Sequence, residues 1–171
     1  MTKEKELEKI IRLSPVGGHV DVRRRITDAP VGYLHGSNIA VANFIDVSSK
    51  SSTLPLGQHF HMNYGEIFGI GTGGGTLYLR AVVPGETNRI NEEIVVPREI
   101  PQYSLPKELY GVEIELRVDS EDPEKRFVRV SPGIAHTFVL SPESLLIPFI
   151  VDAPKDFDPH NKENYVSFPL I

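Results

Sequence analysis

The sequence predicts an all-β protein, a sandwich or a barrel built from short strands. Three observations support this fold class. Apolar segments after residue 14 are short and rich in β-branched residues, and fourteen prolines and fourteen glycines punctuate the chain. Apolar residues at helical spacing are clear only at the N-terminus. With 171 residues, of which 40% are hydrophobic, the chain fits a single domain with a sizeable core.

The elements can be assigned in chain order. Residues 2–13 carry Leu7, Ile10 and Ile11 at helical spacing before Ser14-Pro15, so we expect a short amphipathic helix. Strict alternation makes residues 112–118 the clearest half-buried strand. The other expected strands are short apolar or alternating segments at residues 39–47, 76–83, 127–130, 137–140 and 145–151.

Three further segments read as connections. Residues 84–106 contain four prolines and should form a long excursion with edge strands at most. Residues 71–75 lack the Gly-Lys-Ser/Thr sequence of a phosphate loop, so we expect a hairpin turn between barrel strands. The tail, residues 152–171, is rich in Pro, Asp and Asn and should wrap the outer surface or a neighbouring subunit.

Composition excludes several classes of protein. The formal net charge is −5 with acidic and basic residues intermixed, so we expect no nucleic-acid partner. No run of about 18 apolar residues is present, so we expect no transmembrane helix, and the charged N-terminus is unlike a signal peptide. Cysteine is absent, which rules out a disulfide framework and a thiolate ligand and fits a cytoplasmic location.

Three histidines and a carboxylate indicate a metal site. His59 and His61 are two residues apart, so on a strand their side chains point to the same face. On an unbroken strand Glu66 would face the other way, but residues 63–65 offer a turn or bulge that would return it to the site. With His136 downstream, these groups suit zinc, iron, manganese, nickel or copper. The alternative is a metal-free barrel with hydrogen-bonded histidines.

This pattern resembles the first motif of the cupin superfamily. That motif reads His-x-His, three or four residues, Glu, six residues and Gly, and His59, His61, Glu66 and Gly73 match it. The family also places a glycine six residues before the first histidine, where this chain has Thr53.

The second cupin motif is matched in part. It usually reads Pro-x-Gly-x-x-His, then three residues and Asn, and Gly133 and His136 match it. Ser131 replaces the proline and Leu140 the asparagine, which is not a metal ligand. The resemblance covers about residues 39–151, with a long separation between the motifs that is consistent with an insertion around 84–106.

The resemblance implies an antiparallel double-stranded β-helix, the cupin or jelly-roll barrel. Residues 1–171 would form one cupin domain, with a helix at 2–13, a barrel core at about 39–151 and a tail at 152–171. One divalent transition metal (Zn, Mn, Ni or Fe) would be held by His59, His61, Glu66 and His136, with one or two positions left open. Cupin barrels commonly dimerise, so we also expect a homodimer.

The favoured function is that of a metal-dependent isomerase or epimerase acting on a small sugar or sugar phosphate. The alternatives are a non-haem iron dioxygenase and a non-catalytic barrel that binds or senses a small molecule. Tyr78 and Arg80 alternate with Leu77 and Leu79. If the polar pair faces the interior, Tyr78 is a candidate acid or base and Arg80 a candidate anion-binding group; otherwise both face solvent.

Overall fold

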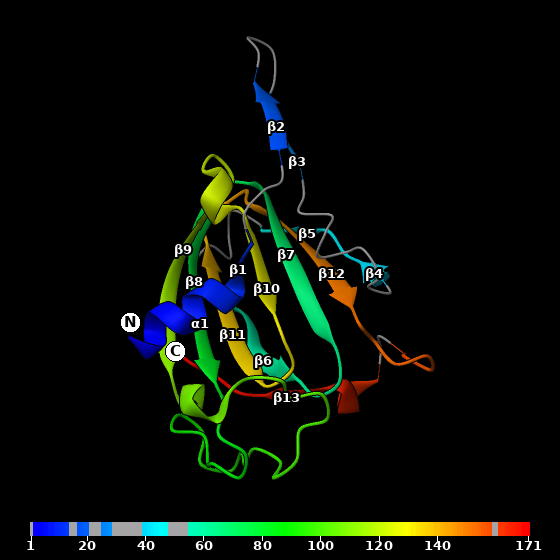
Figure 1. Ribbon diagram of the computed structural model, residues 1–171. Helices are drawn as coiled ribbons and strands as arrows, with labels where there is room; N and C mark the ends of the chain where they lie inside the picture. The colour runs from blue at the N-terminus through cyan, green and yellow to red at the C-terminus, as the bar shows by residue number, and fades with distance from the viewer. Residues whose placement is uncertain (1, 14–16, 21–24, 29–38, 48–54, 159–160) are drawn as a thin grey trace.

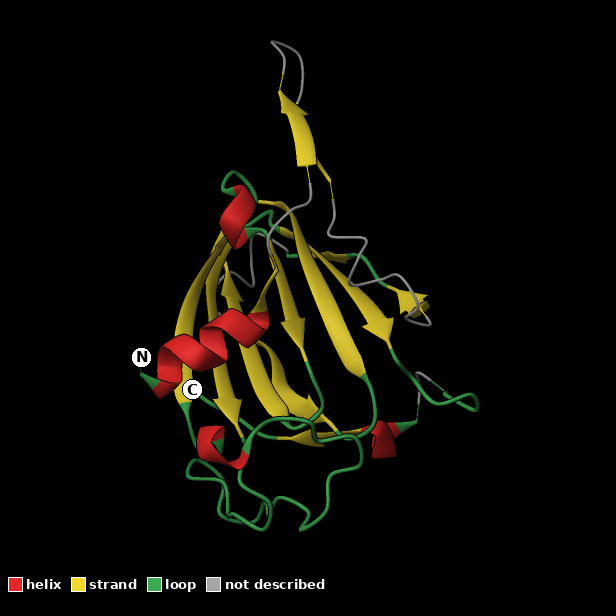
Figure 2. Ribbon diagram, in the orientation of Figure 1, coloured by secondary structure: helices red, strands yellow, loops and turns green. Residues whose placement is uncertain are grey.

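Two antiparallel sheets face each other and form a barrel, with one short helix across one side (Figures 1 and 2). The computed structural model describes residues 2–13, 17–20, 25–28, 39–47, 55–158 and 161–171. The arrangement confirms the predicted all-β class and the antiparallel double-stranded β-helix.

Thr2 caps the N-terminus of helix α1 (Lys3–Ile11), and its Oγ1 accepts a hydrogen bond from the Lys5 amide at 3.4 Å. Leu7 and Ile11 are fully buried in the barrel core, and the helix contacts edge strands of both sheets. The helix is shorter than the predicted 2–13 because the chain becomes extended at Arg12 and pairs with the first sheet as strand β1.

The first sheet has the strand order β1-β10-β7-β12-β4, and β5 also pairs with β12. Its strands are β1 (Arg12–Leu13), β4 (Ile39–Ala42), β5 (Ile45–Asp46), β7 (Gly65–Thr72), β10 (Phe127–Val130) and β12 (Leu145–Val151). The predicted strand at 39–47 is therefore divided into β4 and β5, whereas 127–130 and 145–151 match.

The second sheet has the order β13-β6-β11-β8-β9. Its strands are β6 (Leu56–His61), β8 (Gly74–Ala81), β9 (Glu113–Asp119), β11 (Ile134–Leu140) and β13 (Tyr165–Ser167). Strands β2 (Gly17–Val20) and β3 (Arg25–Asp28) form a separate two-stranded ribbon (Figure 1). Short 3-10 turns in the described part of the chain are η1 (Lys107–Leu109), η2 (Pro123–Lys125) and η3 (Lys162–Asn164).

Residues 71–75 do not form the predicted hairpin turn. They join β7 to β8, which belong to different sheets, so this segment is a corner of the barrel. Gly73 has φ +69°, and a Cβ there would lie 2.3 Å from the Ser144 hydroxyl oxygen. The local sequence indicates a turn at this segment, but it does not show whether the strands before and after the turn pair with each other.

The main core lies between the sheets, and a second apolar cluster lies on the outer face of the second sheet. The outer cluster is formed by Phe60, Val82, Val96, Ile100, Ala135 and Phe168. Val96 and Ile100 come from the 84–106 excursion, which contains one isolated bridge, Thr87 with Val95, and no longer strand, as predicted. Phe168 comes from the tail, which therefore wraps this chain's own barrel.

In the part of the chain that the structure describes, no helix has the length and apolar character needed to cross a bilayer.

Phe60 should be a principal stabilising residue, because its side chain is fully buried between the outer sheet face and the excursion. Phe60→Ala is expected to lower the free energy of unfolding by about 3–5 kcal/mol. Phe44→Ala is the matched control: Phe44 is 71% exposed, so its change should stay within about 0.5 kcal/mol. Denaturant unfolding measures both, and equal losses would contradict this assignment of the core.

Candidate metal centre

Strand β6 carries two of the candidate ligands on its inner face. His59 and His61 point into the barrel, while Phe60 between them lies in the outer cluster. The strand begins with a bulge in which Gly57 has φ +91° and Gln58 φ +61°. A Cβ at Gly57 would lie 2.9 Å from the carbonyl oxygen of His136. Glycine therefore allows β6 to approach β11 closely beside the ligands.

Glu66 reaches the same place from the opposite sheet. Strand β6 ends at His61, and after the turn at residues 62–64 the chain enters the first sheet as β7. Glu66 shares the inward face of β7 with Phe68 and Ile70, which belong to the main core. The expected return of Glu66 to the site occurs through the first of the two predicted alternatives, a turn, and this turn carries the chain from one sheet to the other.

His136 lies on β11, directly across from His59 in the antiparallel register. Gly133 begins the approach to this strand with φ +80°, and its amide donates to the His61 carbonyl oxygen at 3.0 Å. A Cβ at Gly133 would lie 2.4 Å from the Tyr103 ring, so the 84–106 excursion packs directly on the turn that leads to His136. The glycine of the second motif thus fits a crowded position.

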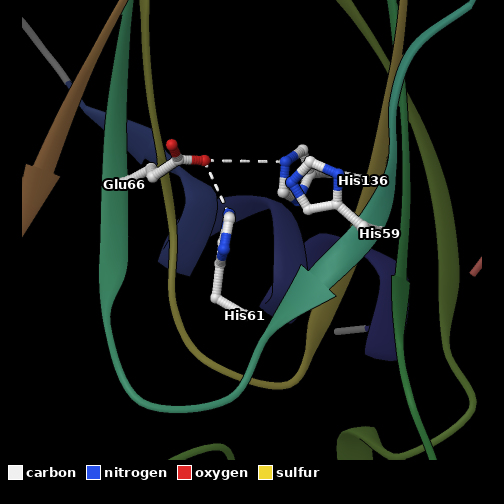
Figure 3. Close-up of side chains that lie close together, drawn as sticks. All are labelled: His59, His61, Glu66 and His136. Atoms are coloured by element: carbon white, nitrogen blue, oxygen red, sulfur yellow. Dashed lines mark hydrogen bonds and ion pairs between the residues drawn. The ribbon is translucent and has the colours of Figure 1, made fainter. Parts of the chain in front are cut away.

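The structure brings all four predicted ligands together (Figure 3). One candidate ligand atom from each residue lies within 4.8 Å of those of the other three. Glu66 Oε2 is 2.7 Å from His61 Nε2 and 3.6 Å from His136 Nε2. His61, Glu66 and His136 are buried, whereas His59 is half-buried.

Burial determines the protonation of these groups. It lowers the pKa of His61 to about 3, and together with the neighbouring charge of His61 it lowers the pKa of His59 to about 4. The pKa of His136 is also held well below its usual value by burial. Burial raises the pKa of the Glu66 carboxyl, although His136 and His59 oppose that effect. At neutral pH the imidazoles are therefore neutral, the form that binds metals.

The residues fit a divalent transition metal. Three neutral imidazoles and one carboxylate lie against one another, three of the four side chains buried and that of His59 half-buried, and one ligand atom of each faces the others. Burying these polar groups together costs free energy unless the burial is compensated, and a cation at the centre of the cluster would satisfy all four ligand atoms. Both the ligand types and their number match sites for zinc, iron, manganese or nickel.

Tyr78 and Arg80 are not brought to this centre. Leu77 and Leu79 face the core, so Tyr78 and Arg80 lie on the outer face of β8. Arg80 Nη2 donates to Glu86 Oε2 at 2.6 Å, and its Nη1 donates to the Glu113 carboxylate. Arg80 thus anchors the start of the excursion to the barrel, on the opposite face from the ligands.

Two tyrosines that the sequence did not single out contact the ligands. The Tyr64 ring lies 4.2 Å from that of His61, and the Tyr165 ring lies 5.1 Å from that of His59. Tyr64 lies within the first motif, between His61 and Glu66, and this position in the sequence could have identified it as a site residue. Tyr165 is 99 residues beyond Glu66, and only the pairing of β13 with β6 brings it here.

Comparison with known proteins finds no matching family profile and no matching curated sequence. Solved structures do match. The sugar 3,4-ketoisomerase of Thermoanaerobacterium thermosaccharolyticum, in complex with TDP, has a TM-score of 0.58 at 11% identity, covering 92% of this chain and 88% of its own.

Two epimerases are similar to the same degree. The dTDP-6-deoxy-D-glucose-3,5-epimerase of Legionella pneumophila, in complex with dTDP-4-keto-L-rhamnose, has a TM-score of 0.58 at 13% identity, covering 91% of this chain and 70% of its own. The dTDP-4-dehydrorhamnose 3,5-epimerase of Bacillus anthracis, with TDP and pyrophosphate bound, has a TM-score of 0.57 at 16% identity, covering 94% and 85%. The protein shares the cupin fold of these enzymes.

Loss of a ligand should abolish tight metal binding. Glu66→Gln and His136→Ala are each expected to weaken Zn²⁺ binding by at least about 100-fold, since even groups that only orient ligands contribute 10–100-fold. Glu115→Gln removes a carboxylate from the exposed face of β9 and should bind like wild type. Chelator competition and elemental analysis of tag-free protein measure this, and full occupancy in both ligand variants would contradict the ligand set.

The stability of the metal-free protein should depend on pH. From pH 6.5 down to about 4 the unfolded chain protonates His61 and the folded chain does not, so the free energy of unfolding falls as pH drops. Each such histidine contributes up to about 1.4 kcal/mol per pH unit. Glu66, whose pKa is raised, acts in the opposite sense: its contribution is present at low pH and is lost as pH rises through its folded pKa.

Denaturant unfolding of wild type and His61→Gln, both with chelator, tests this dependence. Between pH 6.5 and pH 5 the wild type is expected to lose about 2 kcal/mol more than the variant. Equal losses would contradict the lowered pKa of His61 in the folded protein.

Proposed function

We propose that this protein is a metal-dependent isomerase or epimerase acting on a small sugar, a sugar phosphate or a sugar attached to a nucleotide. The observation that carries the proposal is the cluster of His59, His61, Glu66 and His136, whose ligand atoms converge within 4.8 Å inside a cupin barrel. The enzymes of similar fold, which act on sugar nucleotides, support the substrate class.

The four ligands would hold the metal from both sheets. His59, His61 and His136 offer neutral nitrogen atoms, and Glu66 supplies one negative charge, so the bound centre would keep a net positive charge. A divalent metal held there would act as a Lewis acid on a sugar carbonyl and stabilise the negative charge that develops when the neighbouring carbon loses a proton.

The chain's own residues contribute the surroundings. Phe68 and Phe138 pack against His136 and close the barrel interior with apolar side chains. The exclusion of water on that side strengthens electrostatic interactions at the centre. The half-buried His59 marks the more open side, from which a substrate would approach.

Solvent exchange at carbon tests the proposal. The protein, loaded separately with Zn²⁺, Mn²⁺, Ni²⁺ or Fe²⁺, is incubated in D₂O with TDP-4-keto-6-deoxyglucose or with fructose 6-phosphate. Deuterium should appear at a carbon next to the carbonyl, as measured by NMR, because isomerisation and epimerisation both remove that proton. Glu66→Gln should abolish the exchange and Glu115→Gln should retain it.

The outcomes separate the competing functions. No exchange with any metal would overturn the proposal for these substrates. Oxygen consumption by the iron-loaded protein, without exchange, would favour the dioxygenase alternative. Binding of a sugar without exchange or oxygen consumption would favour a sensing barrel. The expected homodimer stays a prediction, which light scattering at micromolar concentration checks.

A further inference from the structure

The C-terminal tail places one tyrosine at the metal centre with a well-defined orientation. Strand β13 pairs with β6 so that Tyr165 lies opposite His61 and Ser167 opposite His59. Residues paired across an antiparallel ladder project to the same face, so Tyr165 shares the inner face with the two ligands. Val166 and Phe168, in alternation, contribute to the outer apolar cluster with Phe60.

The backbone of Tyr165 is held from both sides. On one side the buried Asn164 donates through Nδ2 to the Asp158 carbonyl at 2.6 Å, and its own carbonyl accepts from the Met62 amide at 3.0 Å. On the other side the Phe168 amide donates to the Gln58 carbonyl at 2.7 Å, and the Phe168 side chain is buried. These tertiary contacts therefore fix the position of the Tyr165 backbone.

Among the residues that the structure describes, four aromatic side chains contact the ligand imidazoles, and only one of these four is exposed. Phe68 and Phe138 contact His136, Tyr64 contacts His61, and all three are buried. Tyr165 contacts His59 at 5.1 Å between ring centroids and is 40% exposed. The two phenylalanines have no polar side-chain atom and Tyr64 is buried, so Tyr165 is the exposed residue of these four that has a hydroxyl group.

We propose that Tyr165 is the substrate-contacting residue on the open side of the centre, where its hydroxyl hydrogen-bonds an oxygen of the sugar. This assignment rests on the proposed function and names a binding group for it. His59 is the least buried ligand and the Tyr165 ring packs against it, so a sugar that reaches the centre from this side meets this phenol. The role is to orient the substrate, and Tyr165 is not a metal ligand.

Binding measurements test the assignment independently of turnover. Tyr165→Phe removes the hydroxyl and keeps the ring and the backbone pairing of β13. The variant should bind TDP-glucose about tenfold more weakly than wild type, the loss expected for one hydrogen bond. Its affinity for TDP alone should be unchanged, because the lost contact is with the sugar. Calorimetric titration measures both.

Two controls accompany the measurement. Tyr78→Phe removes a hydroxyl from the outer face of β8, and should bind TDP-glucose like wild type. The absorption spectrum of the Co²⁺-loaded protein should be the same for wild type and Tyr165→Phe, since the ligands are retained. A changed spectrum would overturn the assignment, because Tyr165 would then be acting on the metal site.

The remaining outcomes are distinguishable. Equal affinity of wild type and Tyr165→Phe for TDP-glucose would overturn the role of Tyr165 and leave the proposed function intact. Weaker binding of TDP alone by the variant would also overturn it, since the contact would be with the nucleotide. If wild type binds neither TDP-glucose nor fructose 6-phosphate with the metal present, the substrate class of the proposed function fails and the assignment fails with it.

Discussion

The burial of three imidazoles against one carboxylate is the constraint on which the rest of the site depends. These groups are costly to remove from water, and their burial lowers the pKa values of the histidines and raises that of Glu66. The arrangement is favourable when a cation compensates it. It also needs ligands from two facing sheets, because one strand cannot direct both His61 and Glu66 to the same point.

Strand β6 is the element most closely fitted to this constraint. It is hydrogen-bonded to β11 on one side, where the Gly57 bulge permits close approach, and to β13 on the other. Without β13, β6 would be an edge strand with two ligands at an unprotected border. The outer cluster around Phe60 packs against the outer face of this strand. The excursion and the tail, which look like peripheral segments in the sequence, both stabilise the strand that carries His59 and His61.

The division between the two faces of the second sheet separates binding chemistry from scaffolding. The inner face carries His59, His136 and, from the tail, Tyr165. The outer face carries Arg80, whose ion pairs with Glu86 and Glu113 hold the excursion in place. Arg80 thus has a structural role on the outer face, while the inner face of the same sheet carries the residues of the proposed sugar chemistry.

The sequence by itself determined the fold class and identified the four residues of the candidate metal centre, because both depend on local information. Strand periodicity, turn residues and the spacing of His59, His61 and Glu66 are readable from neighbouring residues. Only the tertiary structure decided that residues 71–75 cross between sheets, that Arg80 faces outward and that Tyr165 reaches the site. Each of these depends on which strands pair and which face meets the core, and pairing joins segments that are distant along the chain.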